Sequence, residues 1–426
     1  MLQTLKNAWV IKEIRNKILF TVMIIMIFRI GSVIPVPFVD TAALKAGATN
    51  EFFNYLSILT GGGLEYGAIF ALSVTPYINS SIIIQLLTVV FKRLQEWSKE
   101  GEEGQKKLAQ LTRWTTAILA LIQGIAYFVY LKNSRYLSVS GTGAVWFAGF
   151  VVVLAFTAGS TLVMWLGEQI DEKGIGNGIS IILFAGILSR GPQAFLRLAH
   201  FWGLKRYVAV VAIVFIFLVV IMFVVWMTHA ERRIPIQYAK RVVGNKMYGG
   251  QNTHIPIKVN MSGVMPIIFS SSILMLPTMV LSFMGTPTKP WAIALAKVLK
   301  LFSVQGTFYA IVYFLLIIGF AYFYATIQFN PVEMANNLRK NGGAIPGIRP
   351  GQPTTDFISK ILSRITLLGA LLLSVIAILP IIVGNVGEIN VSLGGTSMLI
   401  MVGVALDVVR SLESQMMMRH YKGFLD

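Results

Sequence analysis

The chain contains no cysteine among its 426 residues. This absence excludes disulfide bonds, thiolate nucleophiles, iron–sulfur clusters and every zinc site that uses cysteine. Charge is also scarce, because Asp, Glu, Lys and Arg together make up 13% of the sequence, whereas soluble domains carry about 25%. A chain with so little charge cannot cover a water-facing surface. The composition therefore excludes an ordinary soluble globular protein and favours the bilayer as the solvent.

The sequence also lacks the motifs on which common enzyme classes depend. It has no GxxxxGK[ST] loop for nucleotide phosphates and no GxSxG turn for a nucleophilic serine. Its four histidines are scattered and form no HExxH motif. Ionisable residues inside apolar runs are few, whereas a proton-coupled pump usually carries several membrane carboxylates. We therefore expect a protein that is not an enzyme and that needs no cofactor or metal.

What the sequence does contain is long apolar runs, since 55% of its residues are hydrophobic. A helix that crosses the hydrocarbon core needs about 20 mostly apolar residues. The runs that fit this requirement are 18–37, 69–91, 114–131, 144–166, 177–196, 207–228, 263–284, 307–327, 361–383 and 394–412. The sequence therefore predicts an all-α polytopic membrane protein with ten transmembrane helices.

The positive charges indicate the orientation of these spans. If the N-terminus is cytoplasmic, the predicted cytoplasmic segments hold 25 of the 36 Lys and Arg residues and the opposite side holds 10. Cytoplasmic loops normally carry such an excess, so we predict that both termini are cytoplasmic. Two segments go against the trend, because 167–176 is net acidic and 190–206 carries four external positive charges.

A short apolar segment follows the first span. The stretch 51–68 is too short to cross the membrane, and three consecutive glycines from Gly61 to Gly63 end any helix there. We predict a re-entrant half-helix at about 52–66, which requires surrounding protein or a cavity within the membrane. The alternative is an interfacial helix that lies on the membrane surface.

Two of the predicted spans begin with similar sequences. Pro76–Leu86 reads PYINSSIIIQL and Pro266–Leu276 reads PIIFSSSILML, with six of eleven positions identical. Because five spans separate these segments, they run in opposite directions across the membrane. This is the pattern of an inverted-topology repeat, in which functional sites lie between the halves. The chain is therefore predicted to form two five-helix halves, 1–200 and 201–426.

Two long loops on the predicted cytoplasmic side, 230–262 and 328–360, are basic and contain several prolines and glycines. Both are longer than ordinary connections. Basic loops usually reflect only the orientation of the spans. The alternative is a docking platform for a large anionic partner. Proline fixes the backbone around Arg349, which favours docking.

Seven segments, in the order in which they occur along the chain, resemble those of a known family. They are RIGSVIPVP (29–37), FALSVTPYINSSIIIQLLTVV (70–90), GEQIDEKGIGNGISI (167–181), ERRIPIQYAKR (231–241), KVNMSGVMPIIFSSS (258–272), PGIRPG (346–351) and LGGTSMLI (393–400). Together they resemble the SecY family, which provides the central subunit of the protein-translocation channel. The resemblance covers nearly the whole chain and is to the bacterial branch, which implies a location in the bacterial cell membrane.

The resemblance implies an hourglass channel that passes unfolded secretory polypeptides and releases signal or transmembrane segments sideways into the lipid. The implied pore ring consists of Ile78, Ile82, Ile179, Leu183, Ile268 and Ile400. The implied plug at about 52–66 includes Leu56, Ile58, Leu59, Gly61, Gly62 and Gly63. The polar side chains expected at a lateral gate between the second and seventh spans are Ser81, Gln85, Thr88, Gln123 and Ser271. The residues expected to dock a motor or a ribosome are Arg232, Arg233, Lys240, Arg241 and Arg349.

The resemblance also implies a set of partners. These are SecE-like and SecG-like small membrane subunits, the SecA motor ATPase, the ribosome, signal sequences, nascent secretory or membrane proteins, and anionic lipids. The competing interpretation is a secondary transporter of a small solute, since transporters also use inverted repeats and broken helices. A transporter needs a polar site near the membrane midplane. A ring of isoleucines argues against such a site, because an apolar constriction excludes water and ions.

Overall fold

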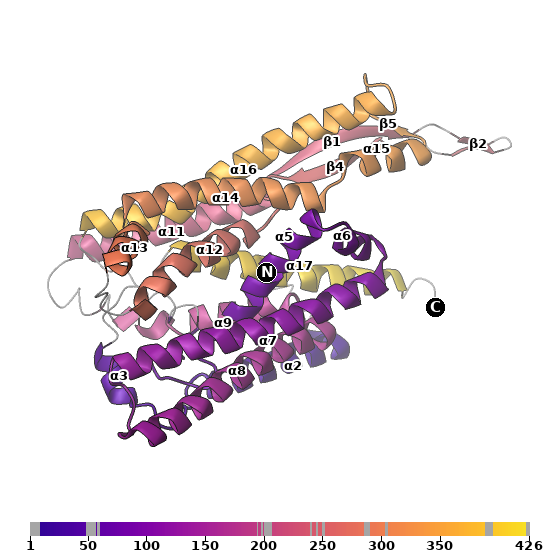
Figure 1. Cartoon of the computed structure of the whole chain (residues 1–426). Helices are drawn as coiled ribbons and strands as arrows, with labels where there is room; N and C mark the ends of the chain where they lie inside the picture. The colour runs from indigo at the N-terminus through magenta and orange to yellow at the C-terminus, as the bar shows by residue number, and fades with distance from the viewer. Residues whose placement is uncertain are drawn as a thin grey trace.

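The computed structural model describes residues 9–47, 57, 60–193, 195–196, 199, 207–238, 241–243, 246–248, 252–284, 290–302, 306–387 and 395–422. Long helices that run side by side dominate it (Figure 1). The helices up to residue 200 are α2 (Lys12–Gly31), α3 (Thr41–Gly47), α5 (Thr75–Val90), α6 (Lys92–Lys99), α7 (Glu102–Asn133), α8 (Thr142–Lys173) and α9 (Gly178–Leu188). The later helices are α11 (Tyr207–His229), α12 (Met265–Met284), α13 (Pro290–Lys300), α14 (Thr307–Gln328), α15 (Pro331–Lys340), α16 (Gln352–Gly387) and α17 (Gly395–Lys422).

Each predicted span overlaps one of these helices, and the all-α polytopic class is confirmed. By length and apolar character, five described helices could cross a membrane, or six if the bent pair α5 and α6 forms one span. The other predicted spans fall on α2, which carries four basic residues, on the 11-residue α9, and on α12 and α17. The number of ten crossings therefore stays a prediction.

Several helices extend beyond the apolar runs that predicted them. α16 begins at Gln352 rather than at 361, and α7 begins at Glu102 rather than at 114. Hydropathy marks where a helix leaves the lipid, but backbone hydrogen bonds continue in water as long as no residue breaks the helix. The second span differs in another way, because α6 turns away from α5 by 103°.

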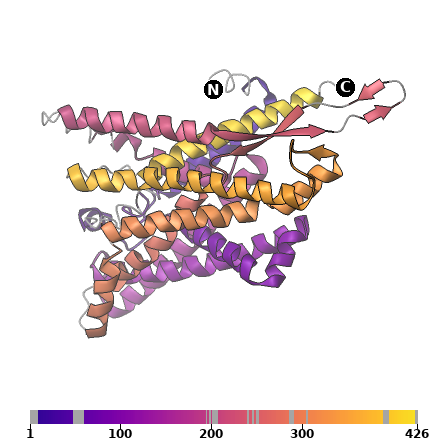
Figure 2. The same ribbon diagram turned by 90° about the horizontal axis from the view of Figure 1, so that it is seen from above.

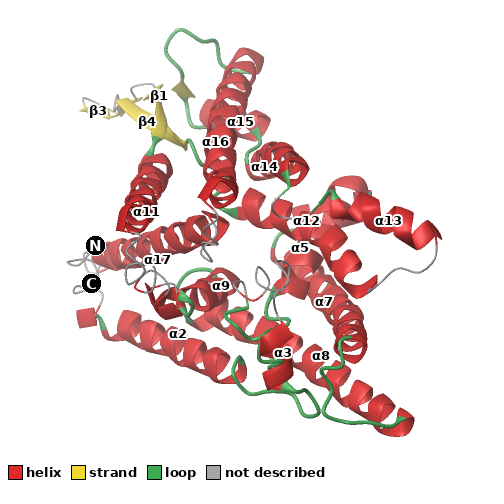
Figure 3. Ribbon diagram, turned by 90° about the vertical axis from the view of Figure 1, so that its left-hand side faces the viewer, coloured by secondary structure: helices red, strands yellow, loops and turns green. Residues whose placement is uncertain are grey.

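The helices form two groups when viewed along their axes (Figure 3). α2, α7 and α8 lie on one side of the picture, α11, α14 and α16 lie on the other, and α9 and α17 lie between them. α5 contacts α12 between the two groups. This arrangement accords with the predicted halves, whose boundary at residue 200 stays a prediction.

The start of α9 lies unusually close to α8. A Cβ atom on Gly178 would lie 2.0 Å from the carbonyl oxygen of Gly167, so only glycine fits at this crossing. The Gly178 amide donates to the Asp171 carboxylate at 2.7 Å, and the Asn177 side chain accepts from the Ser180 amide at 3.0 Å. Asn177 therefore caps the start of α9. These contacts fix the position of α9.

The two long basic loops contain strands that the sequence analysis did not predict. β1 (Glu231–Tyr238) pairs with β4 (Asn252–Lys258) and with the short β5 (Gly343–Ala344), so one sheet joins both loops. A separate ribbon consists of β2 (Arg241–Val243) and β3 (Lys246–Tyr248). β5 covers only the end of β1, so Pro235 has a strand on one side alone, where its missing N–H group is tolerated. From above, α11 leads directly into this sheet (Figure 2).

Candidate functional site

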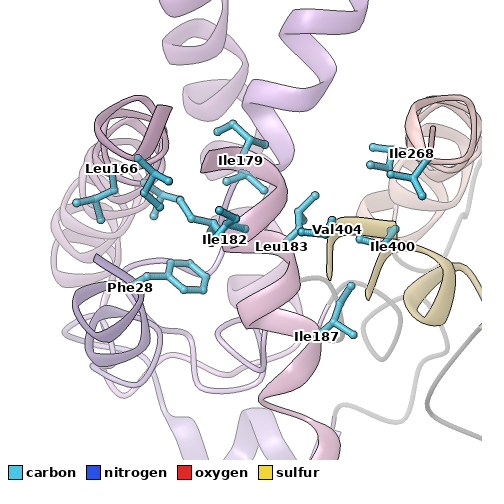
Figure 4. Packing of buried hydrophobic residues seen from close by; sticks show 14 of the residues in the cluster. Phe28, Leu166, Ile179, Ile182, Leu183, Ile187, Ile268, Ile400 and Val404 are labelled. Atoms are coloured by element: carbon cyan, nitrogen blue, oxygen red, sulfur yellow. The ribbon is translucent and has the colours of Figure 1, made fainter. Parts of the chain in front are cut away.

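The six predicted ring residues lie in one hydrophobic cluster. Five of them are at most 9% exposed, and the partly buried Ile78 packs against them. They come from four helices, α5, α9, α12 and α17. Figure 4 shows Leu183 of α9 near Val404 and Ile400 of α17, with Ile268 of α12 on the far side. The structure therefore brings together residues that lie up to 322 positions apart in the sequence (78 to 400).

Helix periodicity explains why two helices contribute two residues each. Ile78 and Ile82 are four positions apart on α5, as are Ile179 and Leu183 on α9, and side chains with this spacing share one helix face. All six side chains are branched aliphatics that carry no polar group. Such a site cannot bind an ion or perform acid–base chemistry, but it can exclude water. Among the described residues, no group of three or more His, Asp or Glu could hold a metal ion.

The predicted plug is described in part. Leu56, Ile58 and Leu59 lie outside the described residues. Ser57 is helical and residues 60–66 form consecutive turns, as expected where glycines end a helix; Gly61 and Gly62 adopt φ values of 66° and 94°, which favour glycine. These glycines replace helical geometry with tight turns.

The described part of this segment is enclosed by protein. Ser57, Thr60 and Leu64 are each at most 3% exposed. The Gly62 amide donates to the Ser57 carbonyl at 2.8 Å, and the Ala68 amide donates to the Gly63 carbonyl at 2.9 Å. Because a surface helix would expose one face, this burial favours the re-entrant interpretation over the interfacial one.

Side chains from α2, from α7 and from the turn after α9 hold the segment in place. Arg29 Nη1 of α2 donates to the Gly61 carbonyl at 3.0 Å, and the Tyr127 hydroxyl of α7 donates to the Leu64 carbonyl at 2.9 Å. Arg190, just beyond α9, forms an ion pair with Glu65 at 2.8 Å. The sequence analysis counted Arg190 only as an external positive charge. The carboxylate of Glu65 within this apolar segment could have indicated a basic partner.

The predicted gate residues lie on three neighbouring helices. α12 contacts both α5, which carries Ser81, Gln85 and Thr88, and α7, which carries the 6%-exposed Gln123. Ser271 of α12 donates to the Ile268 carbonyl of its own helix at 2.9 Å. The helices that carry the predicted gate residues therefore contact one another.

The hydrogen bond that joins two of these helices does not come from the predicted gate residues. Thr88 donates to the Gln85 carbonyl at 2.6 Å, within α5. The Gln85 Oε1 atom is buried without a hydrogen-bond partner in the described part of the chain. The hydroxyl that bridges two helices belongs to Ser80, which donates to the Thr112 carbonyl of α7 at 2.9 Å. Ser80 is not among the predicted gate residues, although the repeat had marked it through its match with Ser270.

The predicted docking residues lie around the sheet. Arg232 and Arg233 are exposed on β1, and the Arg233 Nε atom lies 2.7 Å from the Glu231 carboxylate. Arg241 belongs to β2, whereas Lys240 lies outside the described residues. Arg349 is exposed near β5, so the structure brings the two basic loops to one end of the molecule (Figure 2).

The loop around Arg349 has a defined backbone. The Arg349 carbonyl accepts a hydrogen bond from the Thr354 hydroxyl at 2.9 Å, and Gly347 and Gly351 adopt φ values of 80° and 110°. The neighbouring Ile345 is 4% exposed and packs in the cluster beneath the sheet. The backbone is therefore anchored while the guanidinium group faces the solvent.

The packed apolar helices define a multi-pass helical membrane protein, with an aliphatic cluster where four of its helices meet. The sequence profile of the SecY family matches residues 68–409. The chain is 43% identical to the protein translocase subunit SecY of Bacillus subtilis over 439 residues, with full coverage of both chains. It is 41% identical to the same subunit of Thermotoga maritima over 438 residues, covering all of this chain and 98% of the relative.

Solved structures agree on the fold. A protein-conducting channel superimposes with a TM-score of 0.66 at 16% identity, covering 94% of this chain and 92% of that one. Sec61 from a canine ribosome–channel complex of the endoplasmic reticulum gives a TM-score of 0.61 at 14% identity, with the same coverage. The chain belongs to the SecY family, and the resemblance in its motifs is thereby confirmed.

Proposed function

We propose that this chain is the protein-conducting subunit of a membrane protein translocase. It passes unfolded secretory polypeptides across the membrane and releases signal or transmembrane segments sideways into the lipid. Membership of the SecY family supports this function. The observation that carries it is the aliphatic cluster of six residues from four helices. A small-solute transporter, the competing interpretation, would instead need polar groups at this position.

The aliphatic ring meets two opposing requirements. A polypeptide must pass, but ions must not follow it. Branched aliphatic side chains exclude water when the channel is empty. Each of their contacts contributes only about 0.1–0.2 kcal/mol, so they can separate one by one around a passing chain.

The plug and the lateral gate complete the resting state. The plug at about 52–66 closes the path beside the ring. The gate opens between α5 and α12, the helices that carry the two matching segments of the repeat. Hydrogen bonds between membrane helices contribute about 0.6 kcal/mol on average, so a junction with few of them can open for an apolar signal helix.

The basic sheet end serves as the docking platform for the motor and the ribosome. Arg349 and the arginines of β1 carry positive charge there, and arginine pairs well with carboxylates and phosphates. Since the sequence contains no phosphate-binding loop, a SecA-like motor or the ribosome supplies the driving force. SecE-like and SecG-like subunits and anionic lipids surround the channel. The protein resides in the bacterial cell membrane with both termini in the cytoplasm.

Crosslinking of a stalled secretory chain tests this function directly. The absence of cysteine permits a single cysteine at Ile179 in the ring, with Phe150→Cys on the exposed face of α8 as the matched control. A translocating precursor that carries one cysteine should crosslink to position 179 and not to position 150. Equal crosslinking at both positions, or none at position 179 during active export, would exclude a path through the ring.

A further inference from the structure

Arg190 is the only charged residue in the buried class among the residues that the structure describes, with 8% of its surface exposed. Charged side chains are rarely buried unless a partner compensates them. Its position follows α9 directly, at the end away from Gly178. A charge at this position requires an explanation that packing alone does not provide.

The partners of Arg190 lie in the predicted plug. Its Nη2 atom lies 2.8 Å from the Glu65 carboxylate and also donates to the Ser57 hydroxyl. The side chain of Arg190 is 9% exposed and that of Glu65 is 22% exposed. The ion pair therefore joins the end of α9 to the plug in a largely dry environment.

The same helix connects this ion pair with the ring. Ile179, Leu183 and Gly186 follow at intervals of four and three residues, which places them along one face of α9, and Arg190 follows four residues later in the turn after the helix. The plug packs directly on this face, because a Cβ atom on Gly61 would lie 2.9 Å from the Gly186 Cα atom. Seven residues of helix span about 10 Å, so the ring, the plug contact and the ion pair follow one another closely.

A second arginine contacts the plug in a different way. Arg29 donates to the Gly61 carbonyl at 3.0 Å, so it holds the backbone whatever side chains the plug carries. The pair of Arg190 and Glu65 is instead a contact between two side chains. Substitution can therefore break it, and an exchange of the two residues can rebuild it.

We propose that the Arg190–Glu65 ion pair is a plug latch, which holds the plug on α9 in the resting channel and sets how strong a signal sequence must be to open it. This inference rests on the proposed function. A buried ion pair loses hydration that its mutual attraction only partly restores. When the plug leaves α9, both groups regain water, so the pair can separate. Removal of one partner leaves the other charge buried and unpaired, which favours displacement of the plug.

The test uses purified channel in vesicles with the SecA-like motor and ATP. Glu65→Gln and Arg190→Gln each remove one charge, and the double variant Glu65→Arg with Arg190→Glu rebuilds the pair in reverse. Lys106→Gln is the matched control, because it breaks an exposed ion pair with Glu102. Two precursors are compared, one with a strong signal sequence and one with a weakened signal sequence.

We expect each single variant to export the weakened precursor about tenfold better than the wild type, which corresponds to the loss of one charge-assisted hydrogen bond. The reversed pair should return export toward the wild-type value, and Lys106→Gln should match the wild type. A bifunctional maleimide that joins Glu65→Cys to Arg190→Cys should block export of both precursors, whereas each single-cysteine channel treated alike should stay active.

Each contrary outcome has a separate meaning. A wild-type channel that fails to export the strong precursor would contradict the proposed function itself. If the wild type exports it and both single-charge variants treat the weakened precursor as the wild type does, the latch is wrong. The latch is also wrong if the crosslinked channel exports normally. If the reversed-pair variant accumulates normally but still exports the weakened precursor better than the wild type does, Arg190 and Glu65 do not act as a pair.

Discussion

The two ends of this molecule use arginine in opposite ways. At the plug, Arg190 is 8% exposed and bonds to groups of the same chain. At the sheet, Arg349 is exposed, and its loop fixes the backbone rather than the guanidinium group. The difference teaches that environment decides the role of the same residue type. A buried arginine stabilises an internal contact, whereas an exposed arginine on an anchored loop is suited to a partner.

The largest expected effect tests the exposed end. Arg349→Glu should lower SecA-driven export at least about thirtyfold, because it replaces a cation that pairs with an anionic partner by a like charge. Arg349→Lys keeps the charge but loses the planar fork, and we expect a loss of about fivefold. The measurement is ATP-driven transport of a precursor into vesicles that carry each variant.

The control for this experiment is Lys360→Glu, which changes an exposed charge on α16, the helix that follows the Arg349 loop. Protein abundance and association with the SecE-like subunit should be normal in all three variants, since an exposed loop tip contributes little to folding. Near-normal export by Arg349→Glu would show that the basic loops only reflect membrane orientation.

Substitution of the ring should produce the next largest effect. Replacing Ile78, Ile82, Ile179 and Leu183 together by serine should raise the resting ion conductance of reconstituted vesicles several-fold, because a wetted constriction conducts ions. Conductance equal to that of the wild type would contradict the assignment of the ring. The matched control replaces exposed residues of α8, such as Phe150 and Leu154, by serine.

Deletion of residues 55–64 tests the plug end with a smaller expected effect. The protein should still insert and export, because Gly61 and Gly62 hold turns rather than part of a spanning helix. We expect weaker discrimination among signal sequences and a transient ion leak, measured by export of a weakened precursor and by vesicle conductance. Loss of membrane insertion would instead show that the segment is structural.

The smallest effect concerns the contact between α5 and α7. Ser80→Ala removes the hydrogen bond to the Thr112 carbonyl, but the Thr116 hydroxyl also donates to this carbonyl at 2.7 Å. The acceptor therefore keeps a partner, and the free energy of unfolding should fall by only about 0.6 kcal/mol. Thermal unfolding in detergent measures the change, and a loss several times larger would mean that Ser80 determines how the helices pack.

Local patterns in the sequence predicted what depends on near neighbours. Apolar runs located the helices. The ring residues were implied by the family resemblance, and their spacing by four explains why Ile78 and Ile82, and likewise Ile179 and Leu183, lie on shared faces. The cap at Asn177 also depends only on near neighbours, since it joins residues three positions apart. For these features the physical cause lies within one or two helix turns.

Distant pairings could not be predicted in the same way. Arg190 and Glu65 are 125 positions apart, and neither apolar periodicity nor charge counting joins them. β1 and β5 also meet only after several intervening helices. Prolines at 235 and 256 disfavour strands, and the sequence does not reveal that β1 has a neighbour on only one side at Pro235.

The sheet of β4, β1 and β5 has a mechanical consequence. β1 continues α11, and β5 leads through the Arg349 loop into α16, so a load applied to the loop is shared by two helices. α16 has 36 residues and is therefore about 54 Å long. α16 contacts α14, which in turn contacts α12. A load on the tip is therefore transmitted through α16 and α14 to α12, the helix that contacts α5.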